Sequence, residues 1–344
     1  MTSPVLAVAR PAARRPVPWR RLAWVSWRHY RTASAATGAL LAVVAVYLVV
    51  QGLQMRNAYA AVQACATPST PSCRFALLTF HDTYGNPGFA AAVYIWLPAL
   101  IGAFAGAPLL ARELETGTYR FAWTQGVGRM RWLIALLVSG TLGVALACAA
   151  FGALLSWYQQ PLVDAGIQHR LHPSLFPSTG LAVVGWGLAA YALGVLAGLV
   201  VRRVVPALAV TLALWTGLAF VASNVRAHYE APLATSSLQL PAKDLPIEQW
   251  WSYNGSRVSE AQINQTLQAI GVQQGGGTDN FTVGPGGGSI DPVQYLLQHG
   301  YTQWTSYQPD GRYWTFQAIE FAWLIVVSLL LLAATLRLVR RRAG

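Results

Sequence analysis

Long apolar runs without charge alternate with polar connections along most of this sequence. A helix needs roughly 20 mostly apolar residues to cross a lipid bilayer. Five runs reach that length and contain no Asp, Glu, Lys or Arg: residues 32–55, 83–111, 132–163, 171–201 and 204–225. A sixth run, residues 314–336, contains Glu320 as its only charged residue. The pattern predicts an all-α integral membrane protein with six transmembrane helices, whose ends differ somewhat from the run limits because each long run also includes some loop.

The connection between the fifth and sixth runs is polar and much longer than the others. Its aromatic residues, among them Trp250 and Trp304, predict a small folded domain, and the glycine-rich segment 275–288 predicts a flexible loop within that domain. We therefore divide this part of the chain into spans one to five (residues 32–225), an extracellular domain (residues 226–313) and a sixth span (residues 314–336).

Basic segments flank the membrane helices at both ends of the chain. On a helix, Arg20, Arg21, Arg28 and Arg31 fall within one arc of about 100°, opposite a mostly aromatic and aliphatic face. Residues 19–31 are therefore predicted to form an amphipathic interfacial helix in the headgroup layer. Residues 1–18, which include four prolines, are expected to form a disordered basic tail, and residues 337–344 a basic cytoplasmic tail.

The distribution of arginine predicts the orientation in the membrane. With six spans, one side receives seventeen basic residues and only two acidic ones, Glu113 and Glu115, whereas the other side receives seven basic and nine acidic residues. Because cytoplasmic loops of membrane proteins carry the excess of Lys and Arg, the basic side is expected to be cytoplasmic, with both termini there and the protein in the plasma membrane. The same sorting attributes the net charge of +12 to topology rather than to nucleic-acid binding.

The composition excludes several classes of function. The chain is 54% hydrophobic and 10% charged, whereas a soluble domain carries about a quarter charged residues. Lys243 is the only lysine and lies in Pro-Ala-Lys-Asp, so the Gly-Lys-Ser/Thr of a phosphate-binding P-loop is absent. His169 and His172 have a spacing compatible with a metal, but Asp164 is their only neighbouring acidic residue. We expect no intrinsic catalytic site, no cofactor and no metal.

Two further features left alternatives open. Cys65 and Cys73 flank a connection rich in Pro, Ser and Thr that we place outside the cell, where they form either a disulfide or two independent thiols. Glu320 lies about two turns from the outer end of the sixth run, and a carboxylate inside a membrane often marks an ion pathway. Snorkelling to the interface or a structural hydrogen bond also accounts for Glu320, and we favour these.

The connection between the second and third runs, residues 112–131, is predicted to be a stiff element. The second helix is expected to continue past the bilayer through Glu115, Gly117 permits a turn, and Thr116 or Thr118 can cap a short following helix. A short helix held between two membrane spans transmits force well. The alternative is an ordinary interfacial loop carrying cytoplasmic arginines.

This connection resembles the signature of ABC type-two (export-type) permeases, especially the actinobacterial ones. The resemblance rests on Arg112-Glu-Leu-Glu-Thr-Gly-Thr118, followed by Ala122-Trp-Thr-Gln125 and Arg129-x-Arg131-Trp132. Permeases of that kind have six spans, an amphipathic helix before the first span and a short coupling helix between the second and third, and the corresponding segments occur here in that order. The connection of residues 226–313 is longer than the usual one in the family.

The resemblance implies the transmembrane permease subunit of an ABC exporter, which alternates access while a separate cytosolic ATPase subunit hydrolyses ATP and a second permease copy or paralogue completes a dimer. By position in the motif, it implies that the ATPase contact involves Arg112, Glu113, Glu115, Gly117 and Thr118, with the Arg202–Arg203 turn as a second candidate. Two other classes stay open: a receptor or regulatory protein that senses a ligand through the extracellular domain, and a membrane-embedded enzyme, against which the scarcity of clustered His, Asp and Glu argues.

Overall fold

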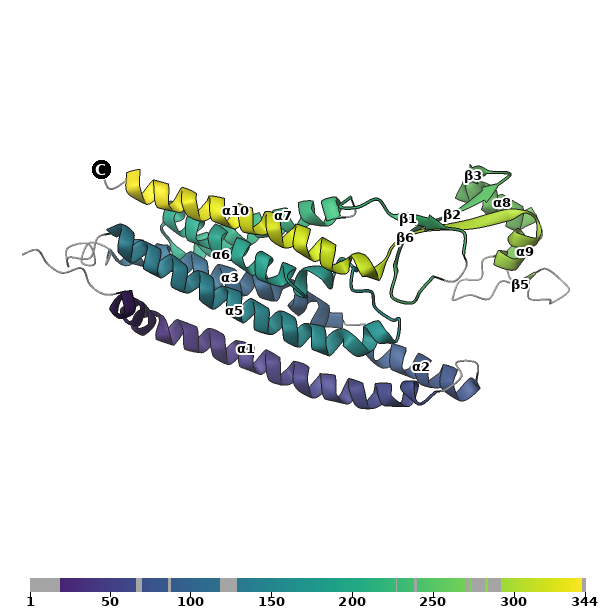
Figure 1. Ribbon diagram of the computed structural model, residues 1–344, viewed down its shortest axis with the longest axis horizontal. Helices are drawn as coiled ribbons and strands as arrows, with labels where there is room; N and C mark the ends of the chain where they lie inside the picture. The colour runs from purple at the N-terminus through teal and green to yellow at the C-terminus, as the bar shows by residue number, and fades with distance from the viewer. Residues whose placement is uncertain are drawn as a thin grey trace, which may run out of the picture.

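The protein consists of a bundle of long helices with a small sheet domain at one end, as a computed structural model shows (Figure 1). The structure describes residues 19–65, 70–85, 88–117, 129–226, 228–237, 240–269, 272–273, 282–283 and 292–341. The predicted tail of residues 1–18, Thr118 and most of the predicted coupling connection therefore lie outside the described residues.

Six helices in the described part of the chain are long and apolar enough to cross a membrane. They are α1 (Trp19–Gln63), α3 (Gly88–Thr116), α5 (Arg129–Asp164), α6 (Ala182–Val201), α7 (Val204–Arg226) and α10 (Tyr313–Arg341). The prediction of a six-span, predominantly helical membrane protein is confirmed. We call the end at which α1 begins and α10 ends the terminal end, and the end that carries the sheet domain the domain end.

Three helix boundaries differ from the sequence expectations. The run of residues 171–201 is not one span, because its first part is a loop that contains the short 3₁₀ helix η1 (Phe176–Ser178), and α6 begins only at Ala182. Residues 71–84 form a separate helix, α2 (Pro71–Tyr84), ahead of the second span. Residues 19–31 belong to the same continuous 45-residue helix as the first span, with no break at residue 32.

Helix α6 lies at the centre of the bundle. Fifteen of its 20 residues are buried, in keeping with a helix that is apolar on every side. Its closest neighbour is α3, and glycines make the approach possible: a Cβ at Gly102 or Gly106 would collide with the backbone of α6. Reciprocally, a Cβ at Gly194 would lie 2.7 Å from the backbone nitrogen of Ala107, and one at Gly198 2.5 Å from its oxygen. Both pairs are GxxxG motifs, which let membrane helices pack backbone to backbone.

The outer helices present apolar side chains outward. Val43 on α1, Leu146 on α5, Phe220 on α7 and Leu330 on α10 are between 65% and 71% exposed. Such a surface is unsuited to water, and it fits the predicted contact with lipid.

The connection between α7 and α10 forms a four-stranded antiparallel sheet in the order β1-β6-β2-β3. Its strands are β1 (Leu233–Thr235), β2 (Leu245–Tyr253), β3 (Ser256–Val258) and β6 (Tyr301–Gln308), and the same region contains α8 (Glu260–Ala269), β4 (Val272–Gln273), β5 (Thr282–Val283) and α9 (Pro292–Gln298). Asn254 and Gly255 join β2 to β3 with φ angles of 48° and 80°, as a two-residue type I′ hairpin requires. Trp250 stacks on Trp304 across the central strand pair. The predicted folded domain is thus a sheet built directly onto the first turn of α10.

Candidate functional site: a capped helix turn and a buried ion pair

The terminal end brings together the two segments predicted to contact an ATPase. The Oε2 atom of Glu115, near the end of α3, accepts a hydrogen bond of 3.2 Å from the backbone nitrogen of Val204, the first residue of α7. The first N–H groups of a helix have no partner within the helix and carry a partial positive charge, so a carboxylate there is stabilising. The end of α3 is therefore tied to the α6–α7 turn by a charge-assisted contact.

The predicted coupling residues divide by exposure. Arg112, Glu115 and the Arg202–Arg203 turn are exposed, whereas Glu113 is only 7% exposed. A partner that docks at this end would meet Glu115 directly, while Glu113 can only shape the end of α3 from within. Gly117 has a φ of +71°, a left-handed conformation that glycine adopts without cost, and it ends the helix as the sequence predicted.

The α6–α7 turn is as short as two residues because Arg202 itself adopts the left-handed conformation. Its φ is 60°, and its N–H donates to the Gly198 oxygen over 3.1 Å, which closes the end of α6. Glycine usually occupies this position, since a side chain there costs roughly 1–2 kcal/mol. Small residues (Ala107, Ala111, Ala197 and Ala207) fill the space beneath, so the ends of α3, α6 and α7 form one compact unit.

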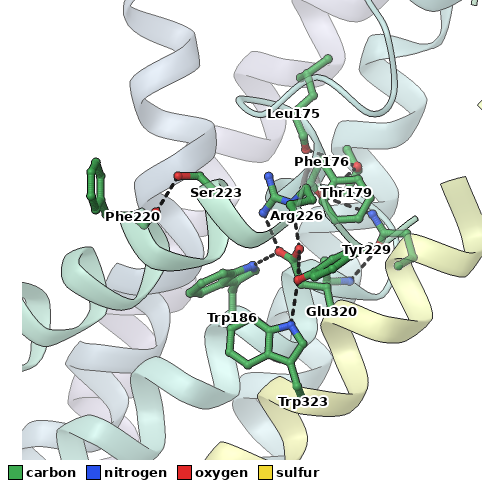
Figure 2. A network of polar contacts seen from close by, with 12 residues as sticks. Leu175, Phe176, Thr179, Trp186, Phe220, Ser223, Arg226, Tyr229, Glu320 and Trp323 are labelled. Atoms are coloured by element: carbon green, nitrogen blue, oxygen red, sulfur yellow. Dashed lines mark hydrogen bonds and ion pairs between the residues drawn. The ribbon is translucent and has the colours of Figure 1, made fainter. Parts of the chain in front are cut away.

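A buried ion pair joins α7 to α10 near the domain end (Figure 2). Glu320 is completely buried and Arg226 is 6% exposed. Arg226 binds the carboxylate through two nitrogens, with Nε 2.8 Å from Oε2 and an Nη 2.7 Å from Oε1. A bidentate contact of this kind is the strongest arrangement that arginine makes with a carboxylate.

Aromatic side chains complete the surroundings of this pair. The indole nitrogen of Trp186, on α6, donates to Oε1 of Glu320 over 2.7 Å, and the Tyr229 hydroxyl donates to Oε2 over 3.3 Å. The Trp323 indole in turn donates to the Tyr229 oxygen over 2.9 Å, and the Arg226 guanidinium lies 4.6 Å from the centre of the Phe176 ring. Burial, and then the charge of Glu320, raises the pKa of Tyr229 to about 12, so this hydroxyl keeps its proton and remains a donor.

The geometry excludes snorkelling of Glu320 and supports a structural role. A carboxylate with four donors has its lone pairs largely occupied, as a buried charge requires if it is not to be strongly destabilising. Sequence reasoning missed the partner, because Arg226 was assigned to the extracellular connection. The available signal was depth in the membrane: Arg226 directly follows the fifth run, and Glu320 lies about two turns inside the corresponding end of the sixth.

Comparison with protein families matches residues 38–226 to the family described as ABC-2 membrane transporter related. The match covers more than half of the 344 residues. The chain belongs to this family. Comparisons with curated proteins and with solved structures gave no match.

The matched part of this ABC-2 family member contains both the end of α3 and the α6–α7 turn. It includes Glu115 and Val204 and ends at Arg226, so the partner of that arginine, Glu320, and the sheet domain lie beyond it. Permeases of the ABC-2 family are the transmembrane components of their transporters.

The remaining candidate residues lie at the domain end. Cys65 and Cys73 form a disulfide that links the end of α1 to the start of α2, with their Cα atoms 5.7 Å apart. His172 Nδ1 lies 2.7 Å from the Ser174 hydroxyl, and burial, followed by the neighbouring His169, lowers the pKa of His172. Within the described ranges, no three His, Cys, Asp or Glu side chains come close enough to hold a metal ion.

Proposed function

We propose that this ABC-2 family protein is the permease subunit of an ABC exporter and that its terminal end faces the cytoplasm, where a separate ATPase subunit docks. The observation that carries the proposal is the bond between Glu115 and the first turn of α7, because it makes the two arginine-flanked segments of the terminal end a single surface. The exposed residues of that surface carry both positive and negative charge: Arg112, Arg202 and Arg203 are basic, and Glu115 is acidic.

In this mechanism the ATPase pushes on the end of α3, and the contact with Val204 passes the displacement to α6 and α7. The backbone-to-backbone packing of α3 on α6 leaves little room for these helices to slide independently, so they move as one body. A second permease copy or paralogue supplies the other half of the pathway, and ATP-driven closure of the two ATPase subunits shifts the equilibrium between the inward-open and outward-open arrangements.

The first test is association with an ATPase. The protein, tagged at its C-terminus and extracted from its native membrane, is expected to co-purify with an ABC ATPase and to stimulate that enzyme's ATP turnover. The hypothesis of a receptor would be favoured instead if the protein retained no ATPase and the sheet domain of the full chain bound a ligand.

The second test is coupling. Glu115→Ala is expected to lower ATPase stimulation and ATP-dependent uptake into inside-out vesicles at least severalfold while leaving insertion intact. Glu260→Ala, an equivalent loss of an exposed carboxylate on α8 of the sheet domain, is the matched control and is expected to behave as wild type. Equal activity in the two variants would remove Glu115 from the coupling contact.

A further inference from the structure

A cavity of about 330 Å³ lies at the domain end, away from the terminal end, and two of its lining residues, Leu175 and Thr179, lie beside the ion pair (Figure 2). It is formed by the last turns of α5, the loop before α6 and the first residues of α10. Five of its eleven lining residues are apolar or aromatic (Trp157, Val163, Leu175, Tyr313 and Trp314), and five are polar or charged (Ser156, Gln159, Gln160, Arg170 and Thr179). The charge of Arg170 is already paired with Asp310 over 3.9 Å. Its volume is within the range of small-molecule sites. Because α5 ends and α10 begins at this level, the cavity lies at the height of the membrane interface, where Trp and Tyr are enriched.

One buried polar side chain that lines this cavity, Gln159, has no hydrogen-bond partner among the described residues. Gln159 is only 3% exposed, and neither its Nε2 nor its Oε1 atom has a hydrogen-bond partner among the described residues. Leaving a buried amide unpaired is costly, and nearly all buried polar groups in proteins are paired. By contrast, Tyr313, which also lines the cavity, donates to the Thr179 hydroxyl. Gln159 therefore has capacity for one ligand that both accepts from Nε2 and donates to Oε1.

The chemistry of that ligand follows from these requirements. A phosphate or carboxylate would accept from Nε2 but leave Oε1 unpaired, and a cation would pair with Oε1 but leave Nε2 unpaired. A hydroxyl group both donates and accepts. Ser156, Gln160 and Thr179 add further hydroxyl and amide groups to the lining, and the aromatic rings offer flat apolar surfaces against which the C–H faces of a sugar ring can pack.

We propose that this cavity binds the hydroxylated head group of an amphiphile, of the glycolipid type, whose alkyl chain lies in the bilayer beside Trp314. The indole of Trp314 is 61% exposed on the first turn of α10, so it borders both the cavity and the surface expected to face lipid. The proposal concerns binding alone and stands whether or not the amphiphile is the transported substrate.

The experiment uses the full chain, extracted directly from membranes into polymer nanodiscs so that no glycoside detergent occupies the cavity. An octyl glucoside carrying a diazirine is photo-crosslinked, and the labelled peptides are mapped by mass spectrometry. We expect label on residues 156–163 or 313–314, competed by octyl glucoside but not by octanol or by free glucose at the same concentration. Gln159→Leu should lower this labelling at least fivefold, while Gln54→Leu, the same change at an exposed glutamine on α1, should leave it unchanged.

The outcomes separate binding from folding. Gln159→Leu removes an unpaired amide from a buried position, so its melting temperature should equal or exceed that of wild type, and a loss of labelling then reports the site and not unfolding. Equal labelling of wild type and Gln159→Leu would overturn the proposal, and so would competition by octanol as strong as that by octyl glucoside. Free glucose competing as well as octyl glucoside would overturn the requirement for an alkyl chain.

Discussion

Replacing Arg226 by methionine removes two of the four hydrogen-bond donors to Glu320 and leaves a fully buried carboxylate with only Trp186 and Tyr229. Breaking a buried ion pair by removing one partner typically costs about 3–5 kcal/mol. Because Glu320 has no exposed surface, water cannot replace the lost guanidinium without opening the bundle. We therefore expect Arg226→Met to lower the free energy of unfolding by about 3–5 kcal/mol, and Glu320→Leu to cost at least as much.

The double variant Arg226→Met/Glu320→Leu should be more stable than either single variant. Apolar replacement of a whole buried ion pair is often neutral, but here the Trp186 indole would lose its acceptor, at about 1–3 kcal/mol. The expected cost of the double variant is therefore about 1–3 kcal/mol, which gives a coupling energy between the two sites of at least about 3 kcal/mol.

The measurement is reversible unfolding by SDS in mixed micelles, followed by circular dichroism, for the wild type, both single variants and the double variant. Arg257 and Glu248 form an exposed ion pair in the sheet domain, and the same cycle there should give a coupling energy below about 1 kcal/mol. Additive losses at Arg226 and Glu320, or a double variant less stable than both single variants, would refute the inference that the two charges stabilise the bundle as a pair.

Three other features give shorter predictions. Gly106→Ala places a methyl group against the α6 backbone and should cost about 1–3 kcal/mol, whereas Gly143→Ala, which meets open space on α5, should be neutral or slightly stabilising by SDS unfolding. Replacing Cys65 and Cys73 by serine opens a loop of sequence separation 8 and should cost about 2–3 kcal/mol, with the same loss on adding reductant to the wild type only. The lowered pKa of His172 means that the folded protein disfavours protonation of this side chain, so stability is lost as the pH falls below about 6.5. The variant His172→Asn should therefore show a smaller fall in melting temperature between pH 7 and pH 5 than the wild type.

The sequence predicted the features that depend on local pattern. Bilayer length and the absence of charge identified all six spans, because a lipid environment leaves few alternatives to a long apolar helix. The short turn at Arg202 and the helix end at Gly117 follow from the same local reading. The sheet domain also carries a local signal, because Asn254-Gly255 between aromatic and β-branched residues is a strong hairpin sequence.

Long-range contacts could not be predicted from those patterns. Arg226 and Glu320 are 94 residues apart, and nothing in the composition of either run says which helices become neighbours. The loop ahead of α6 was hidden for a related reason. Residues 171–181 contain no Asp, Glu, Lys or Arg and were therefore counted into the span, but they turn back to pack against α10, where Phe176 meets Tyr313. The hydropathy of a segment indicates that it avoids water, but it does not distinguish burial in lipid from burial in protein.

The two charged contacts of α7 are unequal in strength, and that inequality has a mechanical consequence for the proposed transport cycle. At about 1.5 Å per residue, the 23 residues of α7 span about 35 Å between Val204 and Arg226. The contact of Val204 with Glu115 is exposed, so water can replace it at little cost, whereas the contact of Arg226 with Glu320 is buried and expensive to open. A displacement passed through the terminal end would therefore shift the first turn of α7 before it disturbs the far end. Helix α7 would pivot about the buried ion pair, with α10 and the sheet domain remaining attached to it.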